Sequence, residues 1–258
     1  MNIHIPTLAP EVVFQIGKLP VTNTMINVWL AMAIFLVVGI FIKKQISLRP
    51  GKLQNFFEYI LEMLMGYFDQ VTGDRKKTLR FMPIVGTVFF FILLSNWLGL
   101  LPGTGSIRIG EAMLLRPANT DLNLTVVMAL FSVLASHLYG FITVGIFTHL
   151  NKFIQIGTFI KSFKKGPIGI FTGFVELGVG LIEIISELAK VLSLSLRLFG
   201  NIFAGEVLIS VIGGLASFLI PTPFMLLELL VGLIQASVFT MLTLVYLTVL
   251  TAEAHAEH

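Results

Sequence analysis

Five long apolar segments run through this chain of 258 residues and limit what it can fold into. A helix needs roughly 20 apolar residues to cross about 30 Å of membrane hydrocarbon. The segments that reach this length are residues 24–42, 82–101, 122–147, 171–220 and 223–250. Only 12% of the residues are charged, whereas soluble domains carry about 25% charge. We therefore predict an all-α polytopic membrane protein, a single membrane domain over residues 1–258 with about five membrane-crossing helices.

The segment between the first two spans has an amphipathic pattern. Over residues 53–70, apolar side chains such as Phe57, Ile60 and Leu64 recur at helical spacing, and polar side chains such as Glu58 fill the other face. The pattern predicts a helix that lies in the membrane interface. A helix that packs its apolar face on the rest of the protein has the same pattern, so both interpretations stay open.

The last two apolar segments are longer than a straight crossing requires. Residues 171–220 would form a helix about 75 Å long at 1.5 Å per residue. Such a helix must lie steeply tilted, project into the cytoplasm, or break at Gly178, Gly180, Gly200 or Gly205. Residues 223–250 are also longer than a straight span requires. Long tilted helices usually follow something, such as a partner surface or a pore.

Basic residues are distributed unequally between the loops. Residues 43–80 hold eight Lys and Arg residues and residues 152–165 hold four, whereas the opposite side holds only Lys18, Arg108 and Arg116. Cytoplasmic loops of membrane proteins are enriched in Lys and Arg. This pattern places residues 43–80 and 152–165 inside, the N-terminus outside and the C-terminus in the cytoplasm.

Motifs of several common chemistries are missing from the sequence. It contains no cysteine, no Walker loop, no dinucleotide fingerprint, no nucleophile elbow and no metal-binding cluster. We expect no metal, no cofactor and no nucleic-acid partner. The first 27 residues lack a basic region followed by an apolar stretch, so we expect no cleaved signal peptide.

Arg197 stands in the middle of the apolar run from Leu192 to Glu206. A guanidinium keeps its charge in a protein. Placing that charge at membrane depth costs between about 2.5 and 17 kcal/mol. An ionisable residue in a membrane span is by default a candidate functional site, and Arg197 is the first such candidate here.

A helical wheel places Arg197 on a polar stripe. At 100° per residue, six polar side chains fall within a narrow sector. They are Glu176, Glu183, Glu187, Lys190, Arg197 and Asn201. The acidic and lysine members of this stripe are also explained by a solvated cytoplasmic face. Glu206 lies nine residues past Arg197 and therefore points to the opposite side of the helix.

The last apolar segment offers Glu228 and Gln235, which share one face because they are seven residues apart. A low dielectric and mutual repulsion both favour the protonated form of neighbouring carboxyl groups. Glu206 and Glu228 are therefore suited to take up and release protons. Gln235 could instead join two helices through hydrogen bonds.

The third apolar segment begins at Asp121 and carries His137 near its middle. Asp121 could cap the helix by accepting a hydrogen bond from a free amide, which does not exclude a role in ion entry. His137 is either a packed polar residue or part of a proton relay, and the sequence does not decide between these interpretations.

Three motifs resemble the a subunit of the rotary F-type ATP synthases. They are Leu194-Ser195-Leu196-Arg197-Leu198-Phe199-Gly200-Asn201 followed by Ala204-Gly205-Glu206, Pro117 followed by Asp121-Leu122-Asn123-Leu124-Thr125, and Glu228 with Gln235. The resemblance covers nearly the whole chain. It implies the stator a subunit of a rotary ATP synthase, in which two proton half-channels couple proton flow to rotation and ATP synthesis.

The resemblance also implies roles for individual residues. Arg197 matches the arginine that faces the c-ring of small hydrophobic subunits. Residues 171–220 and 223–250 match the long tilted hairpin that lies against that ring. Glu206 and Glu228 occupy positions of the outer half-channel, and Asn201, Gln235 and Asp121 match positions associated with it. Family members carry Glu or His at the positions of Glu206 and Glu228, and this chain carries Glu at both.

The resemblance further implies a non-catalytic subunit with several partners. They are the c-ring, b-type peripheral stalk subunits, the rest of the ATP synthase complex and the lipid bilayer. A bacterial plasma (inner) membrane is the expected location, with the mitochondrial inner membrane as the alternative. A stand-alone ion transporter or channel is the alternative function, and it is disfavoured by the odd number of spans and the lack of an inverted repeat.

Overall fold

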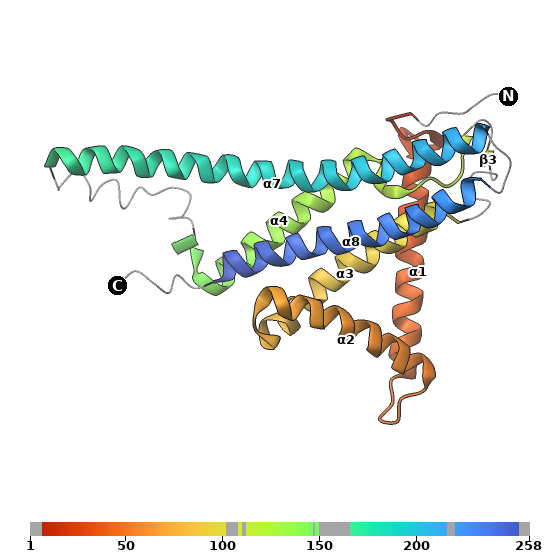
Figure 1. Cartoon of the computed structure of the whole chain (residues 1–258), viewed down its shortest axis with the longest axis horizontal. Helices are drawn as coiled ribbons and strands as arrows, with labels where there is room; N and C mark the ends of the chain where they lie inside the picture. Colours follow the sequence, from red (N-terminus) through yellow and green to blue (C-terminus); the bar gives the residue numbers. More distant parts are fainter. Residues whose placement is uncertain are drawn as a thin grey trace. The chain divides into compact units, whose positions relative to one another are not determined.

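The computed structural model describes residues 7–101, 108–109, 112–146, 148–149, 166–215 and 220–252 (Figure 1). Helices make up most of this part of the chain. The longer ones are α1 (Asn23–Gln45), α2 (Lys52–Thr72), α3 (Arg75–Gly99), α4 (Leu122–Val144), α7 (Gly166–Leu215) and α8 (Pro221–Thr251). The predicted all-α polytopic membrane class is confirmed.

Four of the described helices, α1, α3, α4 and α8, are long and apolar enough to cross a membrane. They correspond to four of the five predicted spans. The fifth predicted span falls in α7, which is not one of these four helices in the described part of the chain. Its crossing of the membrane stays a prediction.

The two longest helices, α7 and α8, follow one another in the sequence and have the predicted excess length. The helix α7 has 50 residues and α8 has 31. The break considered at Gly178, Gly180, Gly200 or Gly205 does not occur, because α7 is continuous past all four glycines. The tilt of the hairpin stays a prediction.

Two helices begin earlier than predicted because their first turns are polar or contain proline. The helix α3 begins at Arg75, seven residues before the predicted span, and the side chain of Asp74 caps it by accepting from the Lys76 amide at 2.9 Å. The helix α8 begins at Pro221. Pro221 and Pro223 fit in its first turn, where a missing N–H removes no helical hydrogen bond.

Short strands were not predicted. The strands β1 (Val12–Ile16) and β2 (Leu19–Thr22) form an antiparallel hairpin around Gly17, whose φ of 65° suits glycine. The two-residue strands β3 (Arg108–Ile109) and β4 (Ala112–Met113) form a second pair. A 3₁₀ turn, η2 (Ala118–Thr120), then leads into α4.

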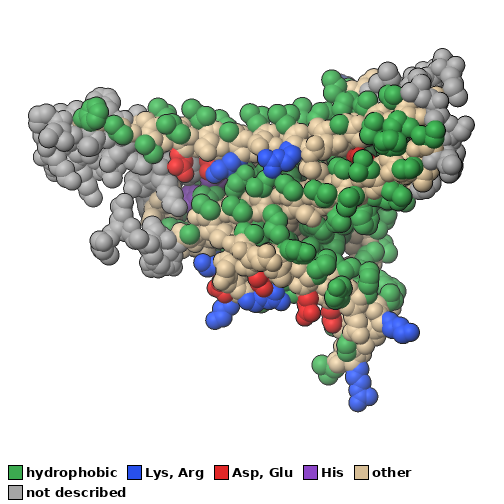
Figure 2. Space-filling view, viewed as in Figure 1, with side chains coloured by type: hydrophobic (Ala, Val, Ile, Leu, Met, Phe, Trp, Pro, Cys, Tyr) green, Lys and Arg blue, Asp and Glu red, His purple; other side chains and the backbone are tan. Residues whose placement is uncertain are grey.

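The predicted amphipathic helix is confirmed as α2. It contacts α3, and its buried residues are Leu64, Phe68 and Thr72. Charged side chains gather around α2 and the loop before it, at the bottom of the view in Figure 2. One side of α2 therefore packs on protein, and its location in the membrane interface stays a prediction.

The chain groups into two compact units. One contains Met1–Thr125 and Leu196–Leu244, and the other contains Val126–Ser195 and Val245–His258. The core of the first unit includes Phe81, Val85 and Ile92 of α3, with Leu198 of α7 and Phe239 of α8. Close packing of buried apolar side chains limits the movement of the polar side chains near them.

Candidate functional site

Arg197 lies on an exposed face of α7. Arg197, Asn201 and Leu208 are exposed, whereas Leu198 and Ile202 are almost fully buried. The alternation matches the helical period, so the buried side packs within the first unit and the Arg197 side does not. The predicted shared face of Arg197 and Asn201 is confirmed.

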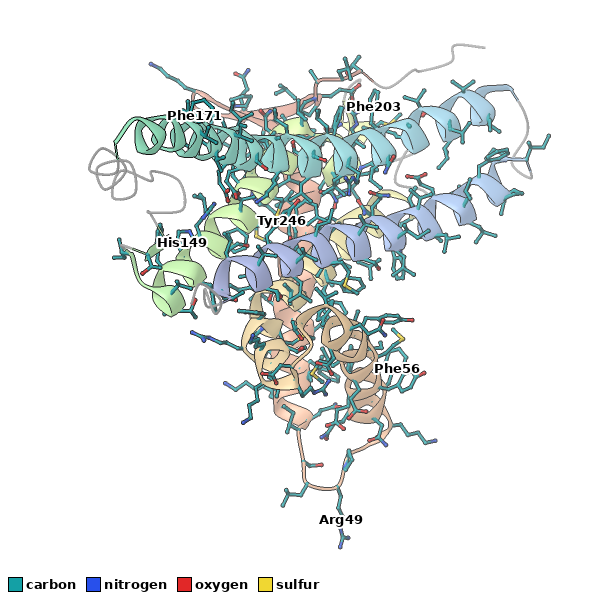
Figure 3. All side chains as sticks on the ribbon, turned by 60° about the vertical axis from the view of Figure 1, so that its left-hand side comes forward. Arg49, Phe56, His149, Phe171, Phe203 and Tyr246 are labelled. Atoms are coloured by element: carbon teal, nitrogen blue, oxygen red, sulfur yellow. The ribbon has the colours of Figure 1, made fainter. Side chains whose placement is uncertain are left out.

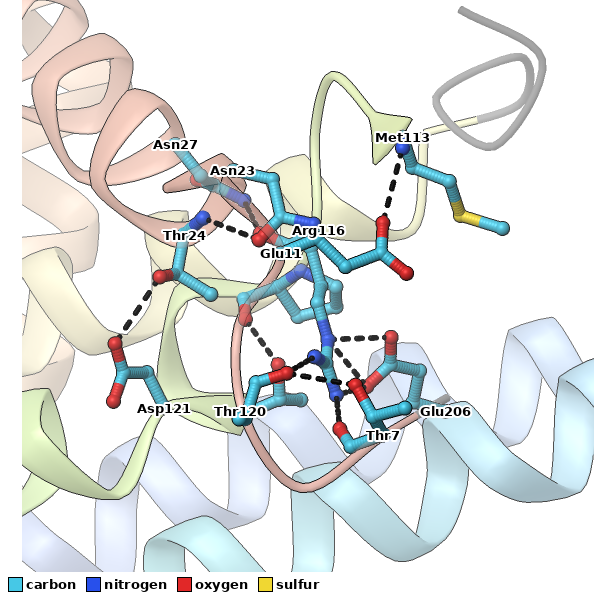
Figure 4. Close-up of polar contacts among 12 residues, drawn as sticks. Thr7, Glu11, Asn23, Thr24, Asn27, Met113, Arg116, Thr120, Asp121 and Glu206 are labelled. Atoms are coloured by element: carbon cyan, nitrogen blue, oxygen red, sulfur yellow. Dashed lines mark hydrogen bonds and ion pairs between the residues drawn. The ribbon is translucent and has the colours of Figure 1, made fainter. Parts of the chain in front are cut away.

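Glu206 points into the first unit and pairs with Arg116. The Arg116 Nε donates to both carboxylate oxygens at 2.8 and 3.1 Å, and its Nη2 donates to Oε2 at 2.9 Å (Figure 4). The side chains are only 5% and 14% exposed. This forked, charge-assisted contact fixes both groups, because a planar guanidinium matches a carboxylate in geometry.

The N-terminal segment holds the other side of Arg116. The guanidinium donates to the main-chain oxygens of Thr7 at 2.8 Å and Ala9 at 3.3 Å. Glu11 continues this attachment by accepting from the Met113 amide at 3.2 Å. Residues 7–11 are thus attached to Arg116 through two main-chain oxygens and to Met113 through Glu11.

Asp121 joins α1 to the start of α4. One carboxylate oxygen accepts from the Thr24 hydroxyl at 3.2 Å, and the other accepts from the Asn123 amide at 2.9 Å. The second contact confirms the capping interpretation. The first contact was not predicted, and it places Asp121 in a buried polar network instead of at an open surface.

Glu228 is buried against α7 beside Glu206. Only 6% of the residue is exposed, and its Oε1 has no hydrogen-bond partner among the described residues. A Cβ built at Gly205 would overlap the Glu228 carboxylate. The absence of a side chain at Gly205 therefore lets this carboxylate approach the α7 backbone, which confirms that Glu206 and Glu228 lie on neighbouring helices.

The turn of α8 that follows Glu228 is fastened to α3. The Asn96 side chain donates to Gly232 O at 3.3 Å and accepts from Asn119 at 2.7 Å, and the Trp97 indole donates to Leu229 O at 3.1 Å. These contacts fix the height of α8 relative to α3. Gln235, three residues past Gly232, is half-buried.

A second polar cluster occupies the other unit. Glu187 accepts from Lys190 at 2.6 Å and lies 3.4 Å from His137 Nε2. Its side chain is only 13% exposed, so a purely solvated face is wrong for Glu187. The predicted Glu187–Lys190 pairing is confirmed, whereas the side chain of Glu176 lies outside the described residues.

Sequence reasoning missed several residues of these sites. Arg116 was counted only as a basic loop residue, although it directly precedes the Pro117–Thr125 motif. His149 carried no periodic signal, because its importance comes from residues far away in the sequence. Gly205 was named in the family motif and as a possible break, but its contact with Glu228 was not predicted. Within the described residues, no group of three or more His, Asp or Glu side chains could hold a metal ion.

We expect Gly205→Ala to weaken both stability and proton flux. The new methyl group would overlap the Glu228 carboxylate, and overpacking a buried site typically costs about 1–3 kcal/mol. Thermal unfolding in detergent and proton flux in vesicles would measure the two effects. Gly200→Ala on the same helix is the control, since a Cβ there meets nothing within 4 Å. Equal behaviour of the two variants would contradict the close approach of Glu228.

Comparison of the sequence with known proteins shows its family. The family model described as "ATP synthase A chain" matches residues 25–248. ATP synthase subunit a of Moorella thermoacetica is 32% identical over 239 residues, which cover 92% of this chain and 94% of that protein. The subunit from Gloeobacter violaceus is 33% identical over 95% of this chain and 90% of its own length. The match covers the helices that carry the sites described above, and the chain belongs to the ATP synthase A-chain family, the membrane-embedded, proton-translocating a subunits of the F-type ATP synthase complex.

Proposed function

We propose that this chain is the non-catalytic stator that presents Arg197 to a rotating c-ring. The observation that carries the proposal is the division of α7 into two faces. Arg197 and Asn201 are exposed, whereas Glu206 turns inward to Arg116. An arginine exposed on a membrane helix keeps its charge, so it can pair with a carboxylate that approaches this face. A carboxylate on each ring subunit would supply that group.

Electrostatics explain how such a pair couples rotation to proton flow. A ring carboxylate beside Arg197 is favoured in its ionised form. Once it moves on into lipid it must be protonated, because an isolated buried charge is too costly. Arg197 cannot pass on a proton of its own. It therefore forces each proton to travel with the ring instead of leaking directly between the two half-channels.

Glu206 and Glu228 are the proposed proton-carrying groups of the outer half-channel. Their support is the contact of the Glu228 carboxylate with α7 at Gly205, the residue before Glu206. Asn201, Gln235 and Asp121 are proposed as polar residues along the same route. The ion pair with Arg116 makes Glu206 the more tightly held of the two carboxylates.

The remaining assignments complete this proposal. Residues 1–258 would act as one membrane domain, with b-type peripheral stalk subunits holding it still against the turning ring. The positive-inside pattern supports an outside N-terminus and a cytoplasmic C-terminus in a bacterial plasma membrane. The mitochondrial inner membrane is the alternative location.

Cysteine cross-linking tests which side of α7 faces the ring. The chain has no cysteine, so single cysteines can be introduced without removing others. We expect Asn201→Cys and Leu208→Cys to cross-link to cysteines introduced into the ring subunits, because both positions are exposed on the Arg197 side.

Ile202→Cys and Glu206→Cys are the matched controls, because Ile202 is 3% exposed and Glu206 points to Arg116. Both should fail to cross-link. Equal cross-linking at positions 201 and 206 would contradict the two-face arrangement, and purification without any ring would favour a stand-alone transporter or channel.

A further inference from the structure

A chain of four polar side chains connects α4, α7 and the residues just after α4 in the second unit. His137 Nδ1 lies 3.0 Å from His149 Nε2, and His137 Nε2 lies 3.4 Å from Glu187 Oε2. Lys190 donates to the other Glu187 oxygen at 2.6 Å. Figure 3 labels His149 beside the end of α4 and Tyr246 on α8. The imidazole of His137 therefore has a carboxylate on one side and a second imidazole on the other.

Packing around the four side chains keeps them in this arrangement. His149 is fully buried and makes an edge contact with the Phe141 ring at 4.6 Å. A Cβ built at Gly140 would overlap the His149 ring, so glycine at this position makes room for the second histidine. The Lys190 ammonium lies 5.1 Å from the centre of the Tyr246 ring, which steadies the lysine by a cation–π contact.

Charge and hydrogen bonding assign a role to each member. Lys190 and Glu187 form an ion pair, so the carboxylate accepts hydrogen bonds and donates none. Donation from His137 Nε2 to Glu187 leaves Nδ1 as the acceptor for the His149 N–H. His149 can pass its Nε2 proton to His137 Nδ1 only after it has taken up a second proton at Nδ1 from the aqueous half-channel. The transfer then leaves His149 neutral and makes His137 an imidazolium whose charge lies against Glu187. The reverse transfer returns the proton by the same path.

Three further ionisable residues, Glu183, Tyr139 and Tyr246, belong to the helices around this cluster. Glu183 stands one turn before Glu187 on α7 and is half-buried, and Tyr139 on α4 is also half-buried. Tyr246 faces Lys190 from α8. Glu187 is thus the carboxylate that contacts His137, and Lys190 is the cation that contacts Glu187.

We propose that His137 is a proton-holding residue of the inner half-channel that exchanges protons through His149, with Glu187 and Lys190 as positioning residues. The proposal rests on the proposed function as the a subunit. In the pumping direction, protons are drawn from the side on which residues 152–165 are expected. A proton held on a histidine matters most at alkaline pH, where free protons are scarce, since an imidazole exchanges protons near neutral pH.

Inverted membrane vesicles that contain the whole complex provide the test. ATP-driven acidification is compared between wild type, His137→Gln and Glu187→Gln from about pH 6 to about pH 8.5, a range that brackets imidazole titration. We expect the pumping rate of both variants to be near normal at the acidic end and roughly tenfold lower than wild type at the alkaline end. A positioned acid–base group typically contributes about 10²–10⁴-fold. The expected loss is smaller because water can carry part of the proton flow. Tyr246→Phe is the control, because it keeps the ring beside Lys190, and it should behave as wild type.

Chemical rescue separates a proton-holding role from a structural one. Added imidazole should restore alkaline pumping in His137→Ala, whereas pyrazole, a far less basic ring of the same size, should not. A loss that is equal at every pH, a failure of rescue, or no loss in either variant would overturn the proposal. Arg197→Ala in the same vesicles tests the a-subunit function itself, so failure of that function is seen separately.

Discussion

Replacing Arg197 by alanine is expected to abolish ATP-driven proton pumping and ATP synthesis while the complex still assembles. The side chain is exposed on α7 and is not part of the apolar core of its unit, so its loss should leave the fold intact. Without its charge, nothing favours the ionised form of a ring carboxylate at this position. Pumping and synthesis in membrane vesicles, with ring co-purification as the assembly check, would measure both parts of this expectation.

Arg197→Lys should fail as well. An ammonium is a compact point charge that can lose its proton when desolvated, whereas a guanidinium keeps its charge. Leu196→Ala is the matched control, because Leu196 is the neighbouring residue and is 53% exposed. It should retain most of the activity. Normal ATP synthesis in Arg197→Ala would show that the arginine is not the coupling residue.

Replacing Arg116 by alanine is expected to destabilise the protein strongly. The Arg116 side chain is 5% exposed, and its guanidinium donates hydrogen bonds to Glu206 and to the main-chain oxygens of Thr7 and Ala9. Removing one partner of a buried ion pair costs about 3–5 kcal/mol because the other charge is left uncompensated. The loss would appear as a lower midpoint of unfolding in detergent and as release of the N-terminal segment to proteolysis.

A double-mutant cycle tests whether the effect of Arg116 acts through Glu206. Adding Glu206→Gln to Arg116→Ala removes the uncompensated charge, so the double variant should lose less stability than the sum of the two single variants. Lys18→Ala is the control, since Lys18 is a basic residue of the same N-terminal region but is exposed. Strict additivity would show that the pair contributes no coupling.

The membrane helices could be predicted because their length and apolarity are properties of continuous segments. The helix α1 differs from the predicted 24–42 by a few residues, and α4 begins at the predicted Leu122. The boundary of α3 was less accurate, because the polar turn capped by Asp74 is helical without being apolar. The strands β1 and β2 were not predicted, because so short a hairpin shows little periodicity in its sequence.

The facing of side chains along α7 could also be predicted, since helical period alone relates residues on one helix. It correctly separated Arg197 and Asn201 from Glu206. The same reasoning could not decide whether Glu187 was solvated. That depended on His137, which lies 50 residues earlier in the sequence.

The sequence by itself determined the membrane class, the long helices, the family motifs and the two faces of α7, because each follows from neighbouring residues or a helical repeat. Only the tertiary structure decided the partners of the buried charges. Arg116 meets Glu206 across 90 residues, and Glu228 approaches Gly205 from another helix. A buried charge takes whichever partner the packing brings within reach, and packing between helices depends on the shapes of many side chains at once.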